Sequence, residues 1–268
     1  MSDNKNIIPN VINESRKIVI KLGSNTLADK EGKINTHFLD EFAEQAAALM
    51  KNGKQIAIVS SGAQVAGLST MGKWARKKDL HYRQALCAVG QVELMWAWRK
   101  AFDKAGIHIA QILLTRDDFE DNKRTLNMRN TLFTLIDEGI VPIINENDSV
   151  SVEEIKIGDN DNLASLSAIL WSADLLILFS DIDGLYNKNP KEFSDASLVP
   201  EVDNVEEIGK KISTGNTNDF GTGGMETKLE AARRAIAYNI PTIIAHGGRE
   251  RALESLASGA QQGTIIKG

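Results

Sequence analysis

Hydrophobic and polar positions alternate between two kinds of segment along the chain. Short apolar runs, typical of strands buried on both faces of a sheet, occur at residues 17–23, 55–63, 107–115, 140–148, 174–184 and 240–248. Segments with helical spacing of apolar residues occur at 37–53, 80–106, 118–139 (chiefly its second half), 163–173, 225–239 and 249–259. Residues 149–159 alternate like an exposed hairpin. The pattern predicts an α/β fold with a mainly parallel sheet of about eight strands, covered by helices on both faces.

Composition places the chain among globular proteins. With 268 residues, 42% hydrophobic and 25% charged, it can bury a large core without disulfides. Its single cysteine, Cys87, lies in an apolar helical run and is expected in the core, which fits a reducing cytoplasm. No apolar run approaches the roughly 18 residues of a membrane span. We expect residues 1–15 to form a flexible extension and residues 16–268 a single domain.

Small and polar residues gather where four of the predicted strands end. In a mainly parallel sheet, such residues share the edge at which ligands bind. We therefore expect a common cleft lined by Lys21 with Gly23–Asn25, Ser60–Ala63, Asn145–Asp148 and Ser180–Gly184.

The stretch GTGGMETK, residues 221–228, is typical of a phosphate site. Its glycines expose backbone N–H groups, a helix follows, and Lys228 can reach the same anion. A flexible loop before a helix is the alternative, and the added lysine favours phosphate. Walker A, dinucleotide, protein-kinase and G-x-S-x-G motifs are absent from the sequence, as is a cysteine–histidine cluster typical of zinc.

Several motifs in order along the chain resemble those of the amino acid kinase family. They are VIKLGSN, IVSSGA, INENDSV, IKIGDNDNLAS, FSDIDGLY and GTGGMETKLEAA, and the resemblance covers about residues 16–268. It implies a three-layer αβα sandwich around a mainly parallel, eight-stranded sheet. The motifs are most similar to those of the branch that uses ATP and Mg²⁺ to phosphorylate the γ-carboxylate of L-glutamate, the first step of proline synthesis. Many members of that branch carry a C-terminal PUA domain, and we expect this chain to be a form without it.

The resemblance also implies roles for individual residues. Lys21 and Lys228 would flank the transferred phosphoryl group, and Asp161 would hold both lysines. Ser61, Asp148 and Asn160 would bind glutamate, and Gly62 would add a backbone donor to the phosphates. The segments that would bind ATP contain Lys21, Gly23, Ser180, Asp181, Thr222, Gly223, Gly224, Met225, Glu226, Thr227 and Lys228. No protein metal ligand is expected, because Mg²⁺ would bind mainly to the phosphates.

The residues implied by the resemblance suit the chemistry of this reaction. The attacking carboxylate, with an ordinary pKa of about 4.3, is already ionised at neutral pH and needs no general base. The difficulty is electrostatic, since one anion must approach another, and lysines, backbone amides and Mg²⁺ meet that need.

Several assignments have structural alternatives. From the sequence alone, Ser61 has equal claim to be a helix N-cap. Asp148 could instead start a turn and Asp181 could form one, but we favour the substrate role for Asp148, and motif position favours ATP binding for Asp181. Glu226 departs from the small polar residue that is common at its position, and it adds negative charge near the expected phosphate.

Other functions remain alternatives to phosphorylation of glutamate. They are a kinase for another acid, such as acetylglutamate or aspartate, a nucleotide sensor that has lost transfer, and an RNA-binding module. The presence of Lys21, Asp161 and Lys228 weighs against the nucleotide sensor. The net charge of −5 weighs against binding to nucleic acid. Inhibition by proline and assembly into a homo-oligomer (dimer or tetramer) are family traits, and no membrane partner is expected.

Overall fold

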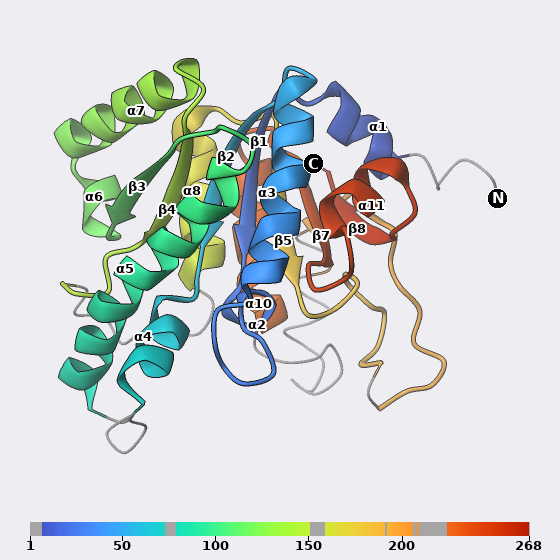
Figure 1. Ribbon diagram of the computed structural model, residues 1–268. Coiled ribbons are helices and arrows are strands. Elements are labelled where there is room, and N and C mark those ends of the chain that lie inside the picture. Colours follow the sequence, from blue (N-terminus) through green and yellow to red (C-terminus); the bar gives the residue numbers. More distant parts are fainter. Residues whose placement is uncertain are drawn as a thin grey trace. The chain divides into compact units, whose positions relative to one another are not determined.

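The computed structural model describes residues 7–72, 79–150, 159–190, 192–205, 208 and 224–267 (Figure 1). The chain divides into two compact units. Unit 1 comprises residues 1–21 and 157–268, and unit 2 comprises residues 22–156. None of the helices in the ranges just given is both long and apolar enough to cross a membrane.

Unit 1 is built on five strands in the order β1-β5-β7-β8-β6. β1, β5 and β7 are parallel, β8 runs antiparallel to β7, and β6 is parallel to β8. Every residue of β5 is buried, as expected for a strand covered on both faces. The strands are β1 (Lys17–Leu22), β5 (Leu175–Ser180), β6 (Glu201–Val202), β7 (Thr242–His246) and β8 (Gly263–Ile266).

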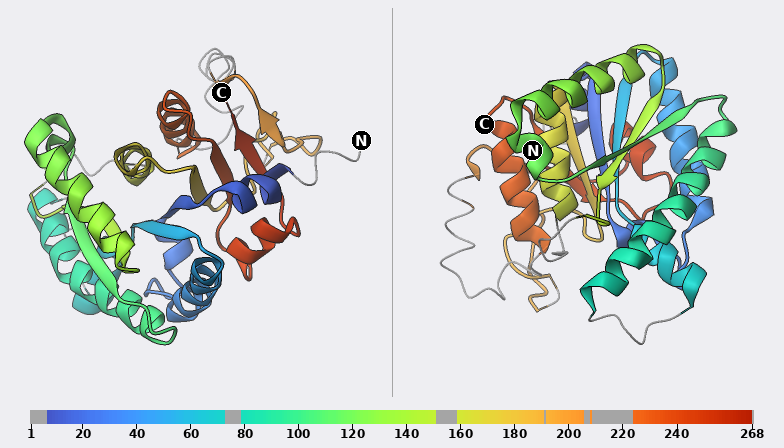
Figure 2. Two further views of the ribbon diagram at one scale, coloured as in Figure 1. Left: turned by 90° about the horizontal axis from the view of Figure 1, so that it is seen from above. Right: turned by 90° about the vertical axis from the view of Figure 1, so that its left-hand side faces the viewer.

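Helices cover both faces of the unit 1 strands. α8 (Asp159–Trp171) and α10 (Gly224–Ile236) pack on each other and on β5 and β7, whereas α1 (Ile7–Glu14) packs on β8 and on α11 (Ala252–Ser258). The view from above in Figure 2 shows these two helix pairs on opposite sides of the strands. This arrangement is the αβα layering that the sequence predicts.

Unit 2 contains three parallel strands in the order β3-β4-β2. α7 packs on β4 and β2, α3 packs on β2 and α5, and α4 packs closely on α5. The elements are α2 (Ser24–Leu27), α3 (Thr36–Lys51), β2 (Gln55–Ser60), α4 (Ala63–Met71), α5 (Leu80–Asp103), β3 (Ile109–Leu114), α6 (Asp117–Glu120), α7 (Asn122–Asp137) and β4 (Val141–Glu146).

The predicted α/β class is confirmed, with two corrections to its details. All six predicted strand regions contain a strand, but β6 and β8 were not predicted, because each is too short for a clear apolar pattern. The expectation of a flexible segment over residues 1–15 is wrong for residues 7–14. They form α1, whose Ile12 is fully buried because α1 packs on α11 and β8. Most of the hairpin predicted at residues 149–159 falls outside the described residues.

Candidate active site

A buried carboxylate with two lysines forms the polar centre of unit 1. Oδ1 of Asp161 lies 2.7 Å from Nζ of Lys21, and Oδ2 lies 3.0 Å from Nζ of Lys228. The hydroxyl of Thr227 donates a hydrogen bond of 2.9 Å to the same Oδ2. Asp161 is fully buried, and Lys21 and Lys228 are only 6% and 7% exposed. The structure therefore brings together the three residues that the sequence predicted to be catalytic.

Local structure explains how residues far apart in the chain meet here. Lys21 is near the carboxyl end of β1, Asp161 lies in the first turn of α8, and Lys228 lies near the start of α10. A carboxylate near a helix N-terminus is stabilised by the helix dipole. α8 and α10 pack on each other, and both helices carry small buried residues, which allow helix axes to approach closely. They are Ala164, Ser165 and Ala168 on α8, and Ala231, Ala232 and Ala235 on α10.

The charges of this centre do not cancel. Two ammonium groups and one carboxylate leave one net positive charge in a buried place, which favours an additional anion. Burial alone would raise the pKa of Asp161, but the two lysines outweigh it and hold that pKa below its ordinary value. Burial lowers the pKa of Lys21, and Lys228 adds to this, although Asp161 acts in the opposite direction. The centre is thus an ionised carboxylate that presents two cations.

The end of β5 contributes Ser180 and Asp181 near this centre. Ser180 is buried and donates a hydrogen bond of 3.2 Å to Oδ1 of Asp181. Asp181 is exposed, and its charge raises the pKa of Lys21, which opposes the larger effect of burial. Asp183, two positions on, accepts hydrogen bonds from Tyr186 and Arg249 and therefore has a structural role in the turn.

The predicted ATP segment at the start of α10 is described from Gly224 onward. The carbonyl of Gly224 accepts hydrogen bonds from Thr227 and Lys228. Met225 is buried and Glu226 is exposed, so the side chain of Glu226 faces solvent rather than the lysines. Thr222 and Gly223, and with them the predicted phosphate loop, lie outside the described residues. Asn160, a predicted glutamate ligand, is half-buried in the first turn of α8.

The other predicted ligands belong to unit 2. Gly23 is the N-cap residue of α2, and Gly62, with a left-handed φ of 105°, is the N-cap residue of α4. Ser61 is therefore not the helix cap, and its backbone N–H donates to the carbonyl of Leu22 at 3.0 Å. Asp148 is half-buried in the turn after β4, so the turn and the ligand interpretations of this residue are compatible.

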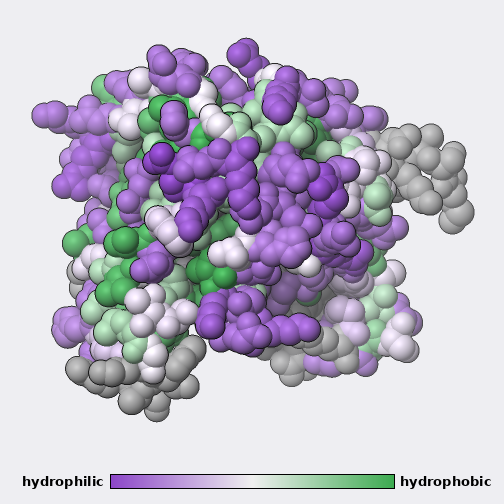
Figure 3. All heavy atoms as spheres, viewed as in Figure 1, coloured by the Kyte–Doolittle hydropathy of each residue, from purple (hydrophilic) through white to green (hydrophobic). Residues whose placement is uncertain are grey.

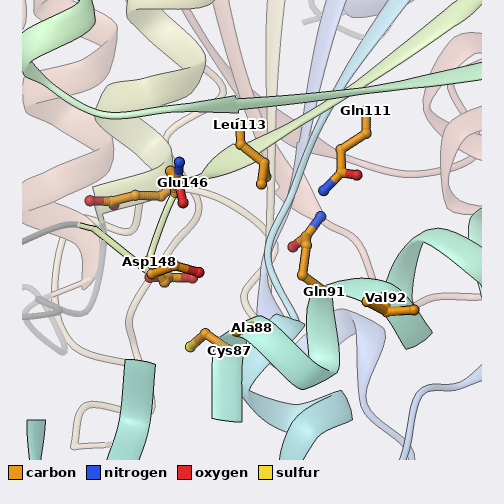
Figure 4. A pocket seen from close by; sticks show the side chains of 10 residues that line it. Cys87, Ala88, Gln91, Val92, Gln111, Leu113, Glu146 and Asp148 are labelled. Atoms are coloured by element: carbon orange, nitrogen blue, oxygen red, sulfur yellow. The ribbon is translucent and has the colours of Figure 1, made fainter. Parts of the chain in front are cut away.

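Asp148 lines a pocket of about 180 Å³ that lies within unit 2. The pocket is formed by α5, by β3 and by the turn after β4, as Figure 4 shows. Its lining residues are Cys87, Ala88, Gln91, Val92, Gln111, Leu113, Glu146, Asn147, Asp148 and Ser149. Cys87 is buried, as predicted, and burial and the neighbouring Asp148 raise the pKa of its thiol. Such a thiol is a poor nucleophile at neutral pH.

Sequence reasoning missed two features of these sites. One is the bond from Thr227 to Asp161, because the motif only indicated ATP binding for Thr227. The other is Gln91, whose Oε1 accepts a buried hydrogen bond of 2.8 Å from Nδ2 of Asn145. The signal for Gln91 was available in the sequence: it is a polar residue on the apolar face of α5 that also carries Leu86, Cys87 and Leu94.

Possible metal ligands do not cluster in the parts of the chain that the structure describes. There, no group of three or more histidine, cysteine, aspartate or glutamate side chains is arranged to hold a metal ion. A Mg²⁺ ion held mainly by phosphate oxygens requires no such group.

Comparison with known proteins adds four findings. The family model described as "Amino acid kinase family" matches residues 16–246. A "Glutamate 5-kinase" from Alkaliphilus metalliredigens is 59% identical over 261 residues, which cover 97% of this chain and 99% of that protein. A "Glutamate 5-kinase" from Treponema pallidum is 42% identical and covers 94% of this chain and 96% of that protein. The UMP kinase structure from Bacillus anthracis has a TM-score of 0.65 at 17% identity, covering 94% and 96% of the two chains, which shows a shared fold.

Proposed function

Since the chain belongs to the amino acid kinase family, we propose that it transfers the γ-phosphoryl group of ATP to the γ-carboxylate of L-glutamate. The products are ADP and L-glutamyl 5-phosphate. The observation that carries this proposal is the buried pair of lysines on Asp161, since a net positive centre suits the transfer of a phosphoryl group between two anions. The "Glutamate 5-kinase" relatives support glutamate as the acceptor.

The bond changes in this reaction need little from the protein beyond positioning and charge. An oxygen of the γ-carboxylate forms a bond to the γ-phosphorus, and the bond from that phosphorus to the bridging oxygen of ADP breaks. The carboxylate is ionised at neutral pH, so no proton must be removed. Catalysis of phosphoryl transfer then consists mostly of alignment and of stabilising charge on the transferred group.

Lys21 and Lys228 would stabilise that charge in the proposed reaction. Asp161 binds both ammonium groups on opposite oxygens and so fixes where they point. Thr227 holds the same carboxylate and so restricts its rotation. Lysine is suited to this role because its ammonium is a compact point charge.

The remaining predicted residues divide between the two substrates. We assign Ser61, Asp148 and Asn160 to glutamate, with the carboxylate of Asp148 on the substrate ammonium. We assign Gly23, Ser180, Asp181 and the run from Thr222 to Lys228 to ATP. Mg²⁺ would bind to the phosphates of ATP and add charge neutralisation there, and the chain's own contribution to that neutralisation is the lysine pair.

An exposed apolar face on α5 supports a homo-oligomer. Val92 is 68% and Trp96 57% exposed, with Val89 one turn before Val92. Figure 3 shows hydrophobic residues, in green, around this helix. A face of this kind commonly marks a protein contact. Light scattering of the wild type and of Val92→Glu tests it, since loss of assembly in the variant alone is expected.

We also propose that proline inhibits the reaction and that the protein is located in the cytoplasm.

Trapping of the acyl phosphate tests the proposed reaction. The chain is incubated with ATP and Mg²⁺ and with L-glutamate, N-acetylglutamate or L-aspartate at equal concentration, and hydroxylamine converts any acyl phosphate to a hydroxamate. We expect product with glutamate only. If product formed only with N-acetylglutamate or only with L-aspartate, that acid would be the substrate instead of glutamate. If no acid gave product, a nucleotide sensor would be favoured.

A further inference from the structure

The pocket of unit 2 contains a buried polar group whose hydrogen-bonding capacity is unused. Gln91 is only 8% exposed, and it lines the pocket. Its Nε2 has no hydrogen-bond partner among the residues that the structure describes. A buried donor without a partner is costly, and in native proteins it commonly marks a place where a ligand or water binds.

Backbone chemistry fixes which way this amide faces. The N–H of Glu146 can only donate, and it lies 2.9 Å from Asn145, so the atom it meets must be the oxygen Oδ1. The other end of the Asn145 amide is therefore its NH₂ group, which donates to Gln91 over 2.8 Å. Gln91 must meet that donor with its oxygen. Its NH₂ group is consequently turned away from Asn145, and Figure 4 shows it directed toward Gln111 across the pocket.

The charges around the pocket define what this donor can bind. Glu146 and Asp148 line the pocket, and none of its lining residues is a lysine or arginine. Arg83, one turn before Cys87 on α5, is not among the lining residues. Burial raises the pKa of the Cys87 thiol and Arg83 acts in the opposite direction, so the charge of Arg83 does reach the pocket. A carboxylate that enters the pocket would still be repelled by both acidic side chains, and among the lining residues only neutral donors can receive it. A primary amide is such a donor, and its hydrogen bond to a charged acceptor is stronger than one to a neutral acceptor.

We infer that Gln91 is a substrate-contact residue whose Nε2 binds the α-carboxylate of the amino acid substrate, while Asp148 binds its α-ammonium group. This inference rests on the proposed function, which already places the ammonium on Asp148, and extends it by assigning the α-carboxylate to Gln91. The pocket then selects zwitterionic acceptors, because a ligand without an α-carboxylate leaves the Nε2 of Gln91 buried without an acceptor. A ligand without an ammonium group brings no positive charge to the carboxylate of Asp148.

Two glutamate analogues separate the two contacts. 4-Aminobutyrate is glutamate without its α-carboxylate, and glutarate is glutamate without its ammonium group. Dissociation constants of L-glutamate, glutarate and 4-aminobutyrate would be measured by calorimetry on the full chain. The proteins compared are the wild type, Gln91→Met, Gln91→Glu, Asp148→Asn and Gln84→Met. Gln84→Met is the matched control, since Gln84 is on the same helix but does not line the pocket.

The expected pattern is crossed: the substitutions at Gln91 and at Asp148 each weaken the binding of L-glutamate and of a different analogue. Gln91→Met weakens the binding of L-glutamate and glutarate by about 10-fold or more and leaves 4-aminobutyrate within about twofold. Asp148→Asn weakens L-glutamate and 4-aminobutyrate and does not weaken glutarate. Gln91→Glu keeps an oxygen for Asn145 but replaces the donor by an anion, so it gives the pattern of Gln91→Met more strongly. Gln91→Glu also tests the inference if Gln91→Met does not fold. Gln84→Met behaves as the wild type.

Weakening of all three ligands by one factor in both Gln91 variants would overturn the inference. It would mean that Gln91 only supports Asn145 or pairs with Gln111. The proposed function is judged separately, by acyl phosphate formation in the wild type. A wild type that forms L-glutamyl 5-phosphate without the crossed pattern keeps the function and refutes the inference. A wild type that shows the crossed pattern without product refutes the function and keeps the assignment of the pocket.

Discussion

Nζ of Lys228 lies 3.0 Å from Oδ2 of Asp161, although 67 positions separate the two residues in the chain. Each sits near the N-terminus of its own helix, α8 or α10, where a cation is unfavourable and a carboxylate favourable. Asp161 thus stabilises a lysine that the dipole of α10 would repel. Lys21 occupies the opposite oxygen of the same carboxylate, so a single side chain sets the position of both cations.

Replacing Asp161 with asparagine should therefore affect both lysines together. We expect kcat to fall by about 100-fold, because misplacing groups around the transferred phosphoryl costs that much. The free energy of unfolding should fall by about 3 kcal/mol or more, since two buried cations lose their anion. Steady-state kinetics and denaturant unfolding measure the two effects.

The control for Asp161→Asn is Asp183→Asn. Asp183 also forms an ion pair in unit 1, with Arg249, but that pair is partly exposed, so the substitution should change kcat less than threefold and stability by less than about 1 kcal/mol. An Asp161→Asn variant with a kcat near that of the wild type would mean that the lysines are positioned without the carboxylate.

Most of the fold could be predicted from the sequence because long buried strands have a clear apolar pattern. β5 is buried at every position and is unmistakable. β6, with two residues, and β8, with four, have no room for a pattern and are defined by pairing with each other and with β7. α1 was missed because residues 1–15 were interpreted from their terminal position, although Ile8, Val11 and Ile12 have helical spacing. The buried Ile8 and Ile12 lie on this helix, which packs on α11 and β8.

Resemblance of motifs predicted which residues belong to the candidate site, but not the contacts between them. Lys21, Asp161 and Lys228 were named from motifs, and the structure adds that they touch. Side-chain direction is set by tertiary packing and cannot be inferred from a sequence motif. The hydrogen bond from Thr227 to Asp161 was missed for this reason. The free NH₂ group of Gln91 was missed for the same reason, since its orientation depends on a backbone N–H 55 positions away, at Glu146.

Thr227 offers a test that separates positioning from ATP binding. We expect Thr227→Val to lower kcat by about 10-fold, because Asp161 loses a hydrogen bond to a charged group. Although Thr227 belongs to the segment assigned to ATP, its hydroxyl donates to Asp161, so the KM for ATP should change less than twofold. Thr227→Ser, which keeps the hydroxyl, should restore most of kcat. A rise in the KM for ATP with kcat unchanged would show instead that the hydroxyl binds ATP directly.

The pKa of Lys21 leads to a prediction for alkaline pH. Burial holds this pKa below the ordinary value of 10.5, so the free enzyme loses the ammonium as pH rises through the lowered value. We expect kcat/KM for ATP, which reports the free enzyme, to begin its alkaline decline at a pH below 10.5. In the ATP complex the phosphates favour the ammonium form, so kcat should persist to higher pH.

Lys21→Arg is the control for that alkaline decline. Arginine stays protonated throughout the range, so the variant should be less active but should lack the decline in kcat/KM for ATP. A decline of unchanged position in Lys21→Arg would assign it to another group.

Gly90 makes the close approach of α5 to α4 possible, and a methyl group there should destabilise unit 2. A Cβ at Gly90 would lie 1.8 Å from the carbonyl oxygen of Ala63 and 2.3 Å from the backbone nitrogen of Gly67. Both neighbours are backbone atoms, so α4 and α5 must separate to admit it. We expect Gly90→Ala to lower the free energy of unfolding by about 2 kcal/mol or more, measured by urea denaturation.

The comparison for Gly90→Ala is Gly106→Ala. Gly106 has a left-handed φ of 69° and open space around it, so alanine there should cost only about 1 kcal/mol, from backbone strain. Gly90 also lies between Cys87 and Gln91 on α5, and displacement of the helix should therefore weaken L-glutamate binding in Gly90→Ala but not in Gly106→Ala. Equal stability losses in the two variants would mean that α4 and α5 separate easily, and the pocket would then not depend on their contact.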